Sequence, residues 1–167
     1  SSTGASPWTV LAQGISLNIG FSIGSVTLIL SIAVLFLWIF LNQKPGIGTV
    51  LNALIIAMMI DLCITFVPTP ESFISQISLA IIAVITVGLG GGIYLVANLG
   101  PGPRDGLMVG LQQKTNLPLA LVRITIEITV VSIGWYLGGV VGIGTLLFAF
   151  GIGPTVALGL FITEKIF

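Results

Sequence analysis

Charged residues are scarce in this sequence. Asp, Glu, Lys and Arg make up only 6% of its 167 residues, whereas soluble domains carry roughly 25%. Five basic and five acidic side chains leave too little polar surface to cover a soluble globule of this size. The basic residues are also too few and too scattered to bind nucleic acid. The low charge therefore excludes a soluble domain and a nucleic-acid partner.

Histidine is absent and cysteine occurs once, as Cys63. Without histidine, the chain cannot ligate haem or zinc through imidazole or build a Ser–His triad, and a lone cysteine makes no internal disulfide or thiolate cluster. No glycine-rich stretch is followed by the Lys-Ser/Thr pair of a phosphate-binding loop. The acidic candidates for an intramembrane hydrolase, Asp61 and Glu127, are expected at different depths. We expect no enzyme activity, no metal and no cofactor.

Apolar residues are abundant: 56% of the sequence is hydrophobic, and the mean hydropathy is +1.21. Apolar runs of about twenty residues, each long enough to cross a ~30 Å hydrocarbon core, recur along the chain. They lack the apolar–polar alternation of barrel strands. We predict an all-α polytopic membrane protein that contacts the lipid bilayer. The five predicted spans cover about 21–41, 47–67, 73–99, 118–137 and 143–162.

The basic residues indicate how these spans are oriented. With five spans, all cations fall on one side of the membrane or one turn inside it, namely Lys44, Arg104, Lys114, Arg123 and Lys165. Residues 1–19 and the turns at 68–72 and 138–142, on the opposite side, contain no Lys or Arg. The positive-inside rule makes the basic side cytoplasmic. We therefore expect a cytoplasmic C-terminus, with residues 1–19 on the outer side.

The sequence repeats itself at an offset of 96 residues. Residues 4–62 and 100–158 are identical at 16 of 59 positions, and Gly46–Thr49 matches Gly142–Thr145. Three predicted spans separate Gly4 from Gly100. Because that number is odd, matching segments lie on opposite faces of the membrane, which is an architecture common in secondary transporters.

These counts predict two inverted three-span repeats within a single membrane domain. Repeat 1 (residues 1–72) holds a short outer helix and two spans; repeat 2 (residues 73–167) holds a span, a short inner helix at 102–115 and two further spans. The first span of repeat 1 is absent from this chain. We expect it in a segment of about 25–30 residues before Ser1; the alternative is that repeat 1 has lost this span.

The residues that carry the repeat also resemble a known family. Segments 5–14, 45–54 and 99–107, the last containing Gly-Pro-Arg-Asp-Gly, are similar to the YczE/YitT-type bacterial membrane proteins. The similarity extends through Arg123, Glu127 and 142–145, and so spans most of the chain. It implies a polytopic protein of the bacterial inner membrane. It implies no substrate, no reaction and no binding residues.

The richest polar segment is the predicted inner helix, 102–115. Pro103 suits a first helical turn and Asp105 complements the helix dipole there. As a re-entrant element, this helix would bind a substrate or ion through Arg104 and Asp105, as half-helices do in transporters. As a plain connection, it would lie in the interface, with Arg104 and Lys114 on lipid phosphates. Its outer counterpart carries Trp8, which suits an interfacial anchor.

Arg123 and Glu127 are four residues apart, so they share a helix face and can pair. A charge at the bilayer centre costs about 2.5–3.5 kcal/mol, which disfavours unpaired burial. In a functional interpretation, Arg123 binds an anion and Glu127 exchanges a proton or cation. In a structural interpretation, the pair pins its helix against neighbouring helices or against Asp105.

Asp61 lies near the outer end of the second span, where the equivalent residue is Ala157. It would relay protons, cap an adjacent helix end or simply face the headgroups.

The second and fifth spans begin with glycines at two pairs of equivalent positions, and such small residues favour close helix packing. These are Gly46, Gly48, Gly142 and Gly144. Residues 88–92 indicate a close crossing or a locally unwound stretch.

Two function classes remain. The first is a secondary-transporter-like carrier of a small polar or anionic solute, with Arg104, Asp105, Arg123 and Glu127 at its site. The second is a non-catalytic accessory or structural subunit, packed in a homo-oligomer or a larger membrane complex. A water-accessible cavity that reaches Arg123 and Glu127 would favour the carrier, and a dry, packed centre would favour the subunit.

Overall fold

The computed structural model describes residues 3–67, 70 and 72–166, and the regular structure in these ranges is entirely α-helical. Five helices are long and apolar enough to cross a membrane, which confirms the predicted all-α polytopic class. Their bounds differ from the predicted spans by at most four residues. The seven helices are α1 (Pro7–Ile19), α2 (Ile23–Phe40), α3 (Ile47–Phe66), α4 (Phe73–Val96), α5 (Pro103–Thr115), α6 (Leu119–Tyr136) and α7 (Ile143–Ile166).

Local sequence signals set the ends of the helices. The side chains of Ser6, Ser22 and Ser72 each accept a hydrogen bond from a backbone N–H in the first turn of the helix that follows, as N-cap residues do. The short helices α1 and α5 end at Gly20 and Asn116, which have left-handed φ angles of 75° and 55°. Glycine and asparagine adopt this conformation at low cost, so both helices stop there.

The helix bounds repeat at the offset found in the sequence. Adding 96 to the bounds of α1 and α2 gives those of α5 and α6, and α3 and α7 begin at the equivalent Ile47 and Ile143. Contacts between the two copies also occur in pairs. The Gly48 N–H donates to the Leu99 carbonyl at 3.0 Å, and the Gly144 N–H donates to the Thr3 carbonyl at 2.6 Å. The same contact is made twice, with the two copies exchanged.

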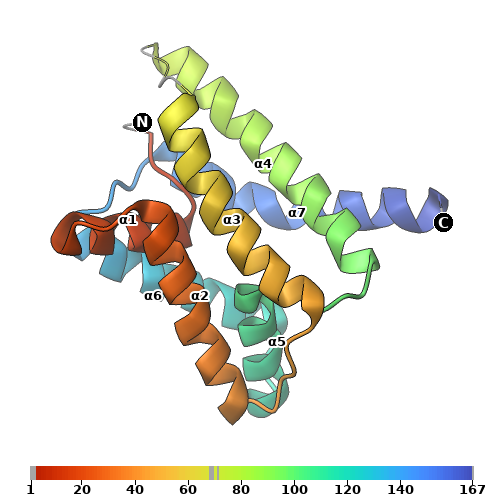
Figure 1. The fold of residues 1–167 in the computed structure, drawn as a ribbon. Helices are drawn as coiled ribbons and strands as arrows, with labels where there is room; N and C mark the ends of the chain where they lie inside the picture. Colours follow the sequence, from red (N-terminus) through yellow and green to blue (C-terminus); the bar gives the residue numbers. More distant parts are fainter. Residues whose placement is uncertain (1–2, 68–69, 71, 167) are drawn as a thin grey trace.

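The two short helices lie against the spans of the opposite copy. α1 packs on α6 as well as on α2, and α5 packs on α2 as well as on α6. These four helices bury one apolar cluster, which contains Trp8, Leu11, Val34, Trp38, Leu107 and Val130. α4 and α7 form a separate packed pair, which crosses at one side of the molecule (Figure 1).

Glycines allow α4 and α7 to approach closely. α4 is continuous through residues 88–92, so this stretch is a close crossing and is not unwound. A side chain at Gly88 would collide with Thr155, and a Cβ at Gly92 would come within 2.6 Å of the Gly159 backbone. Small residues at such crossings let two helices pack backbone to backbone in the membrane.

The crossing predicts opposite effects for two neighbouring glycines of α4. Gly92→Ala should destabilise the fold by about 1–3 kcal/mol, because α7 must move away from the added methyl group. Gly90→Ala is the matched control, since a Cβ there meets no atom within 4 Å and alanine favours a helix by about 1 kcal/mol over glycine. SDS-induced unfolding in detergent micelles measures both. Equal stability of the two variants would contradict the close crossing.

Candidate functional site

The first turns of α1 and α5 meet within the buried apolar cluster. The Arg104 guanidinium carbon lies 5.1 Å from the centre of the Trp8 ring, a cation–π distance. Trp8 and Arg104 occupy equivalent positions in the two copies of the repeat. Helix N-termini carry partial positive charge from unpaired backbone N–H groups, and both contacting side chains belong to the first turn of their helix.

Trp8 differs from its predicted role as an interfacial anchor. Its side chain is only 7% exposed and belongs to the buried cluster, because it stands on the face of α1 that packs against α2 and α6. Among the described residues, no acceptor pairs with its buried Nε1. A buried N–H without an acceptor is costly, so this N–H is available to donate a hydrogen bond to a ligand's oxygen. The Nε1 of Trp38, by contrast, donates to the Pro103 carbonyl at 3.0 Å.

Arg104 and Asp105 stand in the first turn of α5, which is not one of the spanning helices. Burial lowers the pKa of Arg104 to about 10, although Asp105 acts in the opposite direction. Loss of bulk solvent raises the pKa of Asp105, and the guanidinium groups of Arg123 and Arg104 oppose this rise. The only ion pair among the described residues includes neither Arg104 nor Asp105.

That ion pair joins Arg123 and Glu127 on α6. Arg123 Nε donates to Glu127 Oε1 at 3.0 Å, as their spacing predicts. Glu127 is buried, whereas Arg123 is partly exposed and influences the pKa of Asp105. The structure thus places all four candidate residues in one charge network at the junction of α5 and α6. Whether they bind a solute remains a prediction.

Two buried polar residues of α2 were missed in the sequence. Thr27 and Ser31 are buried on α2 at the positions equivalent to Arg123 and Glu127. The offset of 96 would have identified them, since it maps one polar pair onto the other. The hydroxyls of Thr27 and Ser31 donate to helix carbonyls one turn earlier, so the first copy places a neutral polar pair where the second has charges.

The loop before α5 is held by two other helices, α4 and α3. The Tyr94 hydroxyl donates to the Gly100 carbonyl, and the Thr49 hydroxyl donates to the Pro101 carbonyl at 2.7 Å. Side-chain oxygens of Asn52 and Asp105 lie 3.2 and 3.1 Å from the position that a Cβ of Gly102 would take. Asn52, on α3, is therefore a further polar neighbour of Asp105 that the sequence did not reveal.

The four packing glycines approach loops rather than helices. A Cβ on Gly46 would collide with the Leu99 carbonyl, and one on Gly142 would collide with the Thr3 carbonyl. Gly48 and Gly144 donate their N–H groups to the same two carbonyls. The prediction of close packing therefore identified the right residues, although their partners are loop carbonyls.

Asp61 caps a neighbouring helix. Its Oδ1 accepts a hydrogen bond from the Gly24 N–H at 2.7 Å, and its Oδ2 accepts one from the Ser22 hydroxyl at 2.6 Å. Both donors belong to the start of α2. Of the three roles considered for Asp61, the capping of an adjacent helix end is the one that the structure shows.

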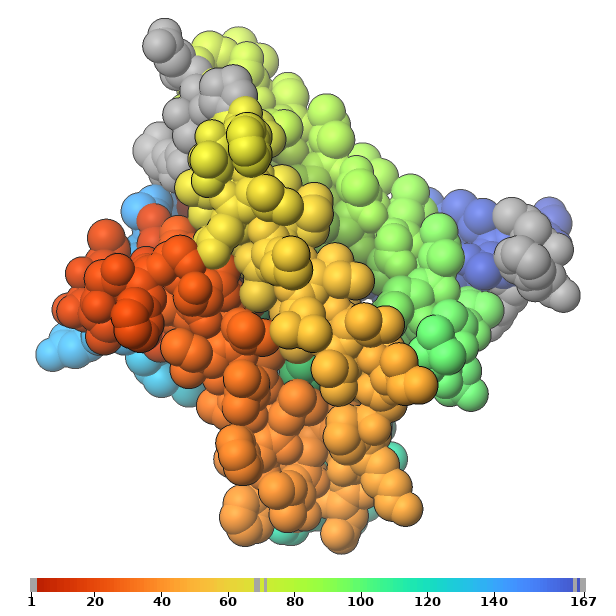
Figure 2. Space-filling model, in the orientation of Figure 1, coloured from red at the N-terminus to blue at the C-terminus, as the bar shows by residue number. Residues whose placement is uncertain are grey.

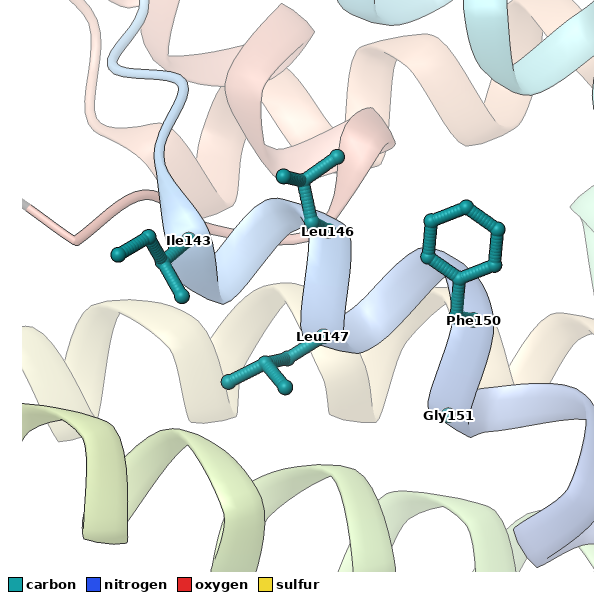
Figure 3. A pocket seen from close by; sticks show the side chains of 5 residues that line it. All are labelled: Ile143, Leu146, Leu147, Phe150 and Gly151. Carbon is teal, nitrogen blue, oxygen red and sulfur yellow. The ribbon is translucent and has the colours of Figure 1, made fainter.

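The two described crevices lie away from the charge network. One, of about 330 Å³, runs along α7 and is lined by Ile143, Leu146, Leu147, Phe150 and Gly151 (Figure 3). The other, of about 160 Å³, lies between Gly4 and the beginning of α4. Neither is lined by a charged side chain. In the described part of the chain, no group of three His, Cys, Asp or Glu residues lies close enough to hold a metal ion.

Five long apolar helices, with the short helices α1 and α5 packed against α2 and α6, define a polytopic helical membrane protein. The chain belongs to DUF6198, a family of unknown function whose family model matches residues 1–160.

Three relatives are similar over most of the chain. An uncharacterised protein of Haemophilus influenzae is 40% identical over 166 residues, which are 99% of this chain and 76% of the relative. The uncharacterised membrane protein YczE of Bacillus subtilis is 32% identical over 147 residues, which are 87% of this chain and 68% of YczE. The uncharacterised protein YyaS of the same organism is 28% identical over 151 residues, which are 88% of this chain and 75% of YyaS. The resemblance to YczE-type proteins is confirmed. No solved structure matches the chain.

The cap on α2 predicts a graded effect of substitutions at Asp61. Asp61→Ala should destabilise the fold by about 1–2 kcal/mol, because the Gly24 N–H and the Ser22 hydroxyl lose their acceptor. Asp61→Asn keeps an oxygen for Gly24 and should stay within about 0.5 kcal/mol of the unmodified protein. Unfolding in micelles measures both variants. If Asn were as harmful as Ala, charge rather than capping would be the function of Asp61.

The raised pKa of Asp105 predicts how stability depends on pH. A carboxyl whose pKa is higher in the folded than in the unfolded chain stabilises the fold below its unfolded pKa, and this stabilisation is lost as pH rises through the folded-state pKa. Asp105→Asn should therefore be as stable as the unmodified protein, or more stable, at pH 7. Between pH 4 and 7, the melting temperature of the unmodified protein should fall more steeply with rising pH than that of the Asp105→Asn variant. The opposite ordering would show that Asp105 is stabilised as an anion.

Proposed function

We propose that the protein is a small carrier of the inner membrane, built from two inverted repeats, that moves a small anionic solute. The coincident helix bounds and the exchanged contacts support a two-fold relation between the copies. Three candidate spans, α2, α3 and α4, separate α1 from α5, and an odd number of crossings inverts the second copy. The basic side faces the cytoplasm in this proposal.

The contact between Trp8 and Arg104 is the observation that carries the proposal. The two residues are equivalent and touch each other. Under a two-fold relation, equivalent residues can touch only at the axis. The charge network therefore lies where the two repeats meet, and carriers of inverted-repeat architecture bind their substrates at this interface.

The chemistry of this interface favours an anion. Arg104 and Arg123 balance Asp105 and Glu127 in formal charge, and the N-termini of α1 and α5 add partial positive charge. The buried Nε1 of Trp8 adds a donor without an acceptor. A small carboxylate or an inorganic oxyanion would pair with Arg104 and this N–H. In this mechanism, Glu127 exchanges a proton as the repeats rock about the site, and no catalytic step is involved.

An accessory subunit of a larger membrane complex is the second candidate. Two observations favour it. Both described crevices lie away from Arg123 and Glu127. The crevice along α7, which no charged residue lines, suits an apolar neighbour rather than a polar solute. In this role the charge network only holds α5 against α6. Homo-oligomers would use the same apolar surfaces.

Transport in proteoliposomes tests the carrier. The full-length protein should move at least one of chloride, inorganic phosphate, acetate and succinate. Arg104→Gln should reduce the flux at least about tenfold, because a charge-assisted hydrogen bond contributes roughly 1.5–3 kcal/mol. Lys114→Gln is the matched control. It removes a cation from the exposed end of the same helix, where Lys114 donates a hydrogen bond to the Phe40 carbonyl, and it should leave the flux unchanged.

Two results would contradict the carrier. One is that none of these four anions binds or moves. The other is equal loss of flux in both variants, which would make general surface charge the cause. Co-purification of the full-length protein with a stable membrane partner, together with absence of transport, would support the accessory subunit instead.

A further inference from the structure

α7 is covered along one face by α4. Thr155 packs against Gly88, and its hydroxyl lies 3.4 Å from the Val84 carbonyl of α4. One turn later, Gly159 packs against Gly92 and Leu89. These contacts bury the face of α7 that points toward α4.

α3 is the equivalent of α7 in the first copy, yet the same face is uncovered. Ile152 of α7 is 4% exposed, whereas the equivalent Ile56 is 40% exposed. Gly159 is buried, whereas the equivalent Cys63 is exposed. Met59, equivalent to Thr155, is 50% exposed. We call Ile56, Met59 and Cys63 the uncovered face of α3; the helix itself lies open on the viewed side of the molecule (Figure 2).

Exposure to lipid alone does not account for this difference. Met58 and Leu62, on another side of α3, are exposed, and so are their equivalents Pro154 and Leu158 on α7. That side faces outward in both copies. The two helices differ at the positions where α4 packs on α7. α3 contacts α2 and α5, but no helix of the described residues covers these positions of α3.

The path of the chain indicates where such a partner would come from. Leu99, three residues after the end of α4, accepts a hydrogen bond from Gly48 at the start of α3. Thr3, the equivalent of Leu99, accepts one from Gly144 at the start of α7. Thr3 therefore lies at the start of α7 as Leu99, which follows α4, lies at the start of α3.

We propose that the uncovered face of α3 is the docking site of a membrane-spanning helix of the same chain, placed before Thr3 as α4 is placed before Leu99. The relatives are long enough to supply it. The match to the Haemophilus influenzae protein leaves 24% of that protein outside the alignment, or roughly 50 residues, and a span needs about 20. The proposal depends on the repeat and not on transport, so it stands or falls separately from the carrier.

Site-specific photocross-linking of the full-length protein in its native membrane tests this assignment. Benzoylphenylalanine at Met59 should cross-link within the chain, to a peptide that mass spectrometry places before Ser1. The same group at Met58, one residue away and facing the side that is open in both copies, is the matched control and should label lipid only. Because either substitution can disturb packing, Ile56, one turn before Met59, repeats the test at a second position of the uncovered face.

Three outcomes would overturn the proposal. If benzoylphenylalanine at Met59 and at Ile56 gave a cross-linked product of twice the molecular mass, a second copy of the protein would occupy the face. Lipid adducts alone at both positions would show that nothing covers it. Cross-links to another region of the chain, with no peptide before Ser1, would assign the face to a different helix.

Discussion

Two hydrogen bonds between the copies of the repeat determine the arrangement of the whole fold. The N–H groups of Gly48 and Gly144 donate to the carbonyls of Leu99 and Thr3, and these carbonyls lie just before the short helices. In a bilayer, an unsatisfied backbone group costs several kcal/mol, so these bonds hold each short helix at the start of a span in the other copy. Only glycine allows the loop carbonyls to approach this closely.

Five of the ten charged residues lie at the start of α2, in the first turn of α5 or in the first half of α6, namely Asp61 through its contacts, Arg104, Asp105, Arg123 and Glu127. Asp61 accepts two hydrogen bonds at the start of α2, and Glu127 is paired with Arg123. Arg104 and Asp105 remain without an ion pair in the described structure, in the first turn of a helix that does not span the membrane. The equivalent turn of the other copy has Trp8 and Thr9. The first turn of α5 therefore differs in charge from the first turn of α1.

The family match covers residues 1–160 and therefore both copies of the repeat. The matched residues thus include both short helices, α1 and α5, and most or all of each candidate span. The second copy contains a covered pair, α4 and α7, whereas α3 presents its equivalent face uncovered. This asymmetry is a property of packing and has no counterpart in hydropathy, since both helices are equally able to span a membrane.

Sequence alone determined the helices, the spans and the 96-residue offset, because these depend on apolar run length and on the local signals of Pro7, Pro103, Gly20 and Asn116. It also predicted the pairing of Arg123 with Glu127, which are one helical turn apart. The tertiary structure decided the rest. The burial of Trp8 and the capping of α2 by Asp61 both depend on which helices pack together. Contacts between residues far apart in the chain set these environments, and neither residue type nor local spacing encodes them.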